Sequence, residues 1–159
     1  MIDGTVIRAH QHAAGAIGGQ EFQSLGRSCG GFSSKIHVKV DALGLPLKFI
    51  VTAGQSHESQ SALELISNDS CEYLLADKAY DISDFRNILI SRGSTPVIPC
   101  KTNRIFQISH DEFLYKERNI VERFFNRIKN FRRIATRYDK TARMFMGALF
   151  MASILLWLR

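Results

Sequence analysis

Four side chains with chemically useful groups recur along one stretch of the sequence at the spacing of an α-helix. They are Tyr115, Arg118, Glu122 and Lys129. At 100° per residue, all four lie within about 60° of one another around the helix axis. A stripe that joins a carboxylate to two cations and a phenol suits a site that handles phosphate groups. It could equally be a solvated face in which Arg118 and Glu122 form an ion pair worth about 0.2–0.5 kcal/mol.

Two aspartates border short apolar segments that we predict to be strands. Asp3 lies within residues 2–7, and Asp77 follows residues 74–76. Carboxylates seldom border buried strands unless something offsets the loss of their hydration. Together with Glu122, they could hold two Mg²⁺ ions, which activate a water or a 3′-hydroxyl and stabilise the leaving oxygen of a phosphodiester. A turn at the end of a strand would also explain Asp77, and a frayed chain end would explain Asp3.

Local patterns indicate the elements that must position these groups. Strands are expected at residues 2–8, 35–40, 45–53, 73–76 and 95–99, and helices at 56–67, 83–91, 114–133 and 144–158. The segment 13–34, rich in glycine, serine and glutamine, is typical of a long loop. Strands that alternate with helices indicate an α/β domain with a mixed sheet.

Composition limits the class of protein. The chain has 159 residues, of which 45% are hydrophobic, so one globular domain is expected and a disordered or fibrous chain is excluded. The formal net charge of +6 favours a polyanionic partner. Three widely spaced cysteines without a CxxC motif argue against a disulfide scaffold. The apolar run 144–158 is short for a membrane span, and residues 1–4 do not begin a signal peptide, so we expect a cytoplasmic protein without a membrane anchor.

Basic side chains cluster around the long predicted helix. They are Arg123, Arg127, Arg132, Arg133, Arg137 and Lys140. Phenylalanine and tyrosine residues are interleaved with them, as on surfaces that follow a phosphate backbone. A solvated basic face is the alternative interpretation.

The motifs taken together resemble the DDE transposases of bacterial insertion sequences, in the IS-four/IS-five superfamily and closest to its IS-five side. The pattern Tyr115-x2-Arg118-x3-Glu122-x6-Lys129 carries the resemblance, with segments 2–12, 30–37, 41–47 and 76–81 in the same order. The likeness covers nearly the whole chain. It implies one RNase H-like DDE catalytic domain over residues 1–159, built on a mixed five-stranded sheet flanked by helices.

The resemblance also implies roles for individual residues. Asp3, Asp77 and Glu122 would be the catalytic triad that binds Mg²⁺, for which Mn²⁺ could substitute. The residues expected to contact DNA are Tyr115, Arg118 and Lys129, with Arg123, Arg133 and Lys35 as further candidates. The expected partner is double-stranded DNA, both at the inverted-repeat ends of the element and at the target, and the chain could pair with a second copy or with the product of an upstream reading frame.

The predicted function is metal-dependent hydrolysis and strand transfer of phosphodiesters at insertion-sequence ends. Full-length members of the family carry a helical DNA-binding segment before the first aspartate, whereas Asp3 is the third residue of this chain. The sequence therefore indicates a core without that segment, either joined to an upstream frame or left as a remnant. Two alternatives stay open: a non-catalytic DNA binder that inhibits the full-length enzyme, and a nuclease selective for branched or hybrid substrates.

Overall fold

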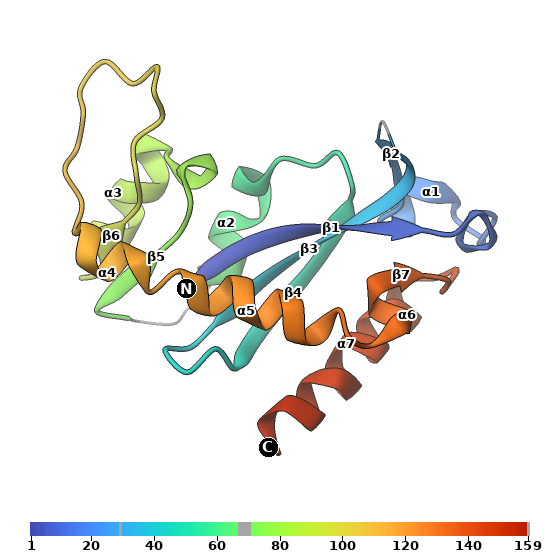
Figure 1. The fold of residues 1–159 in the computed structure, drawn as a ribbon. Helices are drawn as coiled ribbons and strands as arrows, with labels where there is room; N and C mark the ends of the chain where they lie inside the picture. The colour runs from blue at the N-terminus through green and yellow to red at the C-terminus, as the bar shows by residue number, and fades with distance from the viewer. Residues whose placement is uncertain (29, 67–70, 159) are drawn as a thin grey trace.

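The computed structural model describes residues 1–28, 30–66 and 71–158. Its centre is a curled, mixed five-stranded sheet, with α5 (Asn119–Ile128) and α7 (Ala142–Trp157) on one face and α2 (Glu58–Ile66) on the other (Figure 1). The predicted fold class, an RNase H-like mixed five-stranded sheet flanked by helices, is confirmed.

The long strands form as their alternating sequences predict. β1 (Ile2–Ala9) runs antiparallel to β3 (Gly31–Val40), which in turn pairs antiparallel with β4 (Pro46–Ala53). The proline begins β4, where its lack of an amide hydrogen does not interrupt the ladder. The short strands β2 (Gly26–Ser28) and β7 (Thr136–Arg137) complete the sheet, and β7 is parallel to β1.

The prediction of one loop over residues 13–34 is wrong. The 3-10 helix η1 (Gln11–Ala13) is followed by α1 (Gly19–Phe22), β2 and the first residues of β3. Ser33 and Ser34 extend β3 toward its start because they pair with Arg8 and Ile7 of β1. Small polar residues have little strand preference of their own, so only this pairing makes the segment a strand.

Two of the predicted strands do not join the main sheet. β5 (Tyr73–Leu75) and β6 (Thr95–Val97) form a separate parallel pair, joined through the 3-10 helix η2 (Lys78–Tyr80) and through α3 (Ser83–Ser91). Ile2 of β1 packs in one apolar cluster with Leu74 and Ala76, so β5 lies beside the start of β1. The last residue of the predicted helix 56–67 lies outside the described residues.

The long helix predicted over residues 114–133 is divided. α4 (Glu112–Lys116) and α5 are separated by a turn in which Arg118 N–H donates to the Tyr115 carbonyl at 3.0 Å. This i to i+3 bond is the tighter 3-10 geometry. After α5, α6 (Arg132–Ala135) leads into β7. No proline or glycine lies at these breaks, so the sequence predicted one continuous helix.

The main core lies between the sheet and the helices α5 and α7. Val121, Phe124 and Ile128 of α5 pack against Ile36 and Val38 of β3. These three helix residues are the apolar face that a 3.6-residue period predicts. Among the described residues, no helix is both long enough and apolar enough to cross a membrane.

Candidate active site

The alternation of β1 directs Asp3 toward α5. Odd-numbered residues of the strand face that helix, since Asp3 and Thr5 bond to it and Ile7 enters the core beneath it. Even-numbered residues face α2, where neighbouring side chains lie close to Gly4. A Cβ atom at Gly4 would lie 3.2–3.3 Å from side-chain atoms of three residues. The first predicted site residue therefore sits on the inner face of the sheet, under α5.

Arg118 joins two of the three predicted carboxylates. One guanidinium nitrogen donates to Asp3 Oδ2 at 2.9 Å, and the other donates to Glu122 Oε1 at 2.5 Å. The Asp3 and Arg118 side chains are 13% and 17% exposed, whereas Glu122 is 54% exposed. The predicted ion pair between Arg118 and Glu122 is present, and the fork of Arg118 extends it to a residue 115 positions away.

The environment of Asp3 opposes its ionisation. Burial raises the pKa of Asp3 to about 6, although the Gly4 amide and the Arg118 guanidinium both act in the opposite direction. The Gly4 N–H donates to Asp3 Oδ1 at 2.8 Å. The loss of hydration and the nearby negative charges therefore destabilise the ionised form of Asp3 more than Arg118 stabilises it.

Asp77 stands at the end of β5, where it caps η2. Its Oδ1 accepts a hydrogen bond from the Ala79 amide at 2.9 Å. Burial raises the pKa of Asp77, and the negative charge of Glu58 raises it further, against the opposing effect of Arg118 and Lys35. Asp77 and Asp3 also repel each other electrostatically. The turn that was the alternative interpretation is therefore present, and it places the carboxylate beside Asp3 and Arg118.

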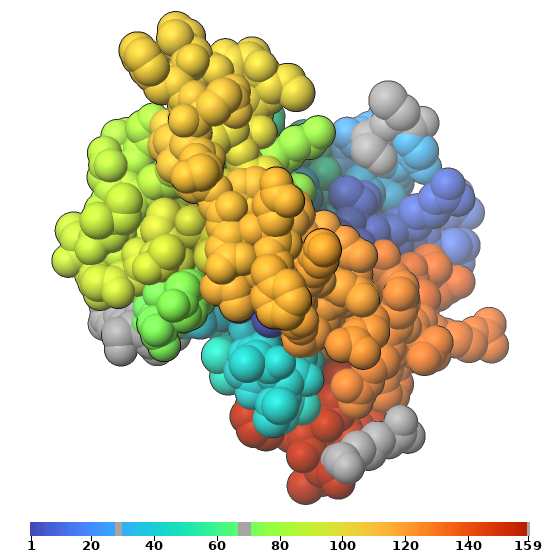
Figure 2. Space-filling model, turned by 60° about the vertical axis from the view of Figure 1, so that its left-hand side comes forward, coloured from blue at the N-terminus to red at the C-terminus, as the bar shows by residue number. Residues whose placement is uncertain are grey.

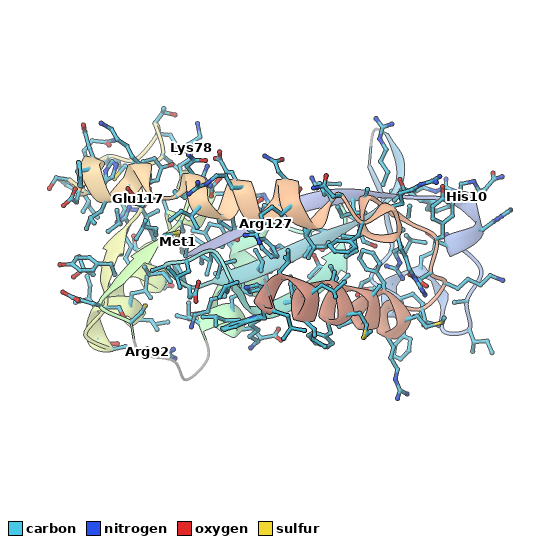
Figure 3. The ribbon with its side chains drawn as sticks, turned by 60° about the horizontal axis from the view of Figure 1, so that its bottom comes forward. Met1, His10, Lys78, Arg92, Glu117 and Arg127 are labelled. Atoms are coloured by element: carbon cyan, nitrogen blue, oxygen red, sulfur yellow. The ribbon has the colours of Figure 1, made fainter. Side chains whose placement is uncertain are left out.

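The remaining members of the helix stripe also point to this region. Lys129 Nζ donates to Thr5 Oγ1 at 2.7 Å, and burial lowers the pKa of Lys129. The Arg118 guanidinium lies 5.9 Å from the centre of the Tyr115 ring, within the range of a cation–π contact. Figure 3 shows Lys78, which follows Asp77, and Glu117, at the end of α4, at the same end of the molecule. The stripe therefore faces the strand that carries Asp3.

Glu58 is a fourth acidic residue at the site that the sequence analysis missed. It lies in the first turn of α2 and forms an ion pair with Lys35 at 2.8 Å. Its charge raises the pKa of both Asp77 and Asp3. The buried His37 lies beside this pair, and burial lowers the pKa of His37 to about 4. Glu58 carried no signal beyond an acidic residue at a helix start, because its closeness to Asp77 depends on how α2 packs.

A buried ion cluster supports the turn that follows Asp77. Asp81 accepts hydrogen bonds from the Arg86 side chain, the Arg104 side chain and the Lys101 amide, each at 2.8 Å. Burial alone would raise the pKa of Asp81, but these donors lower it. Arg86 also donates to the Ile98 carbonyl at 2.7 Å. η2, α3 and the segment after β6 are therefore held together four residues beyond Asp77.

The other basic residues differ in exposure and in their partners. The Arg123 side chain is exposed and makes no hydrogen bond or ion pair with another described residue. Arg133 is tied to Asp139, with its Nε donating to Oδ2 at 3.0 Å. Arg137 is fully buried and donates to Ser34 Oγ at 2.6 Å, so its assignment to a DNA-binding surface is wrong. Lys35 faces Glu58 rather than open solvent.

The three predicted carboxylates are ligands of the type that a hard divalent cation prefers. Asp3, Asp77 and Glu122 offer carboxylate oxygens, and the Arg118 guanidinium already places a positive group between two of them. Across the described part of the chain, no three acidic, histidine or cysteine side chains gather closely enough to hold a metal ion. The carboxylates therefore have the right chemistry, but Arg118 must leave Asp3 and Glu122 before both can share a metal.

Comparison with known proteins identifies the family of this chain. A family model described as "Transposase DDE domain" matches residues 1–157. The chain is 38% identical over 129 residues to a Brucella ovis protein assigned as a transposase for insertion sequence element IS6501, covering 80% of this chain and 99% of that protein. It is 30% identical over 121 residues to a Burkholderia cepacia protein assigned as a transposase for IS402, covering 69% of this chain and 55% of that protein. No solved structure matches significantly. The chain therefore belongs to the family of transposase DDE domains.

Proposed function

We propose that this chain is the catalytic core of a DNA transposase, which hydrolyses phosphodiesters at insertion-sequence ends and transfers the freed strand to target DNA. Membership of the transposase family supports DNA as the partner. The observation that carries the proposal is the Arg118 fork between Asp3 and Glu122, with Asp77 beside it. Asp3 and Arg118 are thus in contact although 115 positions separate them in the chain, and both lie in the motifs that carry the family resemblance.

The carboxylates are the proposed ligands of Mg²⁺ or Mn²⁺. When bound, two such ions supply an activated hydroxyl group and stabilise the leaving oxygen. Asp3 lies on β1 and Asp77 in the hydrogen-bonded turn after β5, so regular backbone structure presents both carboxylates. Glu122 is the most exposed of the three, and it projects from the first turn of α5, where it can adjust to a substrate.

The cations of the stripe are proposed to hold the DNA. A phosphate group that approaches Asp3 would meet Arg118, whose planar fork suits bidentate binding of phosphate oxygens. Lys129 lies farther along the same face and would neutralise a neighbouring phosphate. Tyr115 can stack on a base or donate a hydrogen bond. Arg123 is exposed and free to reach the backbone, whereas Lys35 and Arg133 would first have to leave Glu58 and Asp139.

Pairing with a second copy of the chain is part of the same proposal. α7 and the residue after it expose seven large apolar side chains, each 49–79% accessible. They are Met144, Phe150, Met151, Ile154, Leu155, Trp157 and Leu158. A contiguous apolar surface of this kind is typical of a protein–protein contact. Light scattering coupled to size-exclusion chromatography would test it, and a monomer at high concentration would contradict it.

The test of catalysis is strand cleavage and joining on duplexes that carry the ends of the element. Glu122→Gln should abolish both reactions in Mg²⁺ and in Mn²⁺, because a neutral amide oxygen binds a divalent cation much more weakly than a carboxylate does. Glu117→Gln is the matched control, since Glu117 is exposed on the preceding turn and should be dispensable. Joining that survives Glu122→Gln would contradict the assignment. Cleavage of branched substrates without joining would point to a nuclease, and binding without cleavage would point to a non-catalytic binder.

A further inference from the structure

The segment between β6 and α4 projects from the molecule and exposes two adjacent bulky apolar side chains. Ile105 is 88% exposed and Phe106 is 82% exposed. Single exposed apolar residues are normal on a protein surface. Here, however, the two are adjacent in the segment between β6 and α4, which projects from the rest of the molecule (Figure 1 and Figure 2). The exposure of such a pair to water is unfavourable, and a partner that covers both side chains would remove this cost.

Hydrogen bonds on both sides of Ile105 and Phe106 hold the loop in shape. Arg104 donates to Asp81 Oδ1 at 2.8 Å and to Ser83 Oγ at 3.0 Å. The Gln107 side chain donates to the Arg104 carbonyl at 2.9 Å. At the base, the Ile108 amide donates to Cys100 Sγ at 3.1 Å. Ile105 and Phe106 are therefore presented between two anchored residues, Arg104 and Gln107.

The same anchors place the loop next to the candidate active site. Asp81, which receives Arg104, lies four residues after Asp77. On its other side the loop descends to His110, whose ring lies 5.3 Å from that of Tyr115. Tyr115 in turn contacts Arg118. DNA held at Arg118 and Asp77 would thus have the loop beside it.

The charge of the loop fits a nucleic acid. Residues 101–110 contain Lys101, Arg104 and His110 but no aspartate or glutamate, and since Asp81 pairs with Arg104, Lys101 is the cation that can meet a phosphate. Apolar side chains inserted between base steps, with cations on the flanking phosphates, are a general means of unstacking and bending a duplex. Aromatic rings also stack on unpaired bases whatever the sequence.

We infer that Ile105 and Phe106 insert into the base stack of duplex DNA beside the cut strand and unstack it there. The inference rests on the proposed function, since it takes the DNA to be bound at Arg118 and Asp77. The bases next to the reacting phosphodiester are its binding partner, and Lys101 contacts the backbone. Arg104 remains on Asp81 and transmits the position of the loop to the turn that carries Asp77.

The test is binding of the whole chain to a short duplex that carries 2-aminopurine, whose fluorescence rises when the base is unstacked. We expect the unmodified chain to raise the fluorescence. Phe106→Ala should remove most of this rise and weaken binding about tenfold. The slope of log affinity against log salt should stay unchanged, because no charge is removed. Phe22→Ala is the matched control: Phe22 is 77% exposed on α1 at the opposite end of the molecule, and this change should alter neither signal (Figure 1).

The outcomes separate this inference from the proposed function. If Phe106→Ala binds and unstacks DNA like the unmodified chain while cleavage at the ends is present, the inference is overturned and the proposed function stands. If the unmodified chain binds no duplex, both the inference and the proposed function are contradicted. If Phe106→Ala changes the oligomeric state but not DNA binding, the loop contacts protein and the inference is again overturned. Ile105→Ala repeats the test at a second exposed position, and thermal unfolding verifies that each variant is folded.

Discussion

Replacement of Asp3 by asparagine should stabilise the protein at neutral pH, although Asp3 is a proposed catalytic residue. Burial raises the pKa of Asp3 from 3.8 to about 6. Between these two values the folded chain holds a proton on Asp3 that the unfolded chain has released. The free energy of unfolding that Asp3 contributes is therefore fully present below about pH 4 and is lost as pH rises through about 6.

The size of the effect follows from the shift. Each pH unit corresponds to about 1.4 kcal/mol, so the rise in the pKa of Asp3 costs about 3 kcal/mol at neutral pH. Asparagine has the shape of the protonated acid and avoids this cost. Arg118 keeps Glu122 as a partner, so the substitution leaves no unpaired buried cation. Asp3→Asn should match the unmodified chain near pH 4 and exceed its stability by up to about 3 kcal/mol near pH 8.

The assay is urea unfolding of both proteins across this pH range in a chelating buffer, so that no divalent cation binds. Asp84→Asn controls for the loss of one negative charge, because Asp84 is exposed at the start of α3. The difference in the free energy of unfolding between Asp84→Asn and the unmodified chain should stay nearly constant from about pH 4 to about pH 8. If Asp3→Asn instead becomes less stable relative to the unmodified chain as pH rises, the ion pair with Arg118 outweighs burial and the reasoning is refuted.

Three further predictions concern the same site. Arg118→Met leaves the buried Asp3 without its cation and should cost up to about 1.4 kcal/mol at pH 7 in urea unfolding, because Asp3 takes up a proton once its pKa exceeds the ambient pH; the cost should shrink in an Asp3→Asn background. Gly4→Ala should cost about 1 kcal/mol, because the side chains of Lys35, Glu58 and His37 must shift slightly to admit the methyl group; an unchanged unfolding midpoint would contradict this. Mn²⁺ at about a hundred times its dissociation constant should raise stability by about 2.7 kcal/mol, and Asp77→Asn should abolish the rise; equal rises in both proteins would place the metal elsewhere.

The local patterns of the sequence identify the parts of the site that lie within single elements. The alternation of residues 35–40 predicts the strand that β3 contains, and the helical period predicts that Val121, Phe124 and Ile128 share one face. The i, i+4 spacing likewise predicts the bond between Arg118 and Glu122. Each of these contacts depends only on neighbours in the chain, so the repeat of a helix or strand is sufficient to predict it.

Contacts between distant segments were not available from such patterns. The strand β7 and the burial of Arg137 follow from pairing with β1 and from the hydroxyl of Ser34. The division of α4 from α5 reflects where each helix packs, and no residue type marks it in the sequence. In the same way, β5 and β6 have the sequences of buried strands, but nothing local states which strands they pair with.

The sequence by itself determined which groups this protein offers: a helix stripe with one carboxylate and two cations, two aspartates at strands, and a net positive charge. Only the tertiary structure decided how they meet. Asp3 faces Arg118 because the register of β1 puts odd residues under α5, and a shift of one residue would turn it to the other face. The charge of Glu58 acts on Asp77 because α2 packs against the cluster that contains β5. The raised pKa of Asp3 follows from burial, which belongs to the folded chain as a whole and to no residue alone.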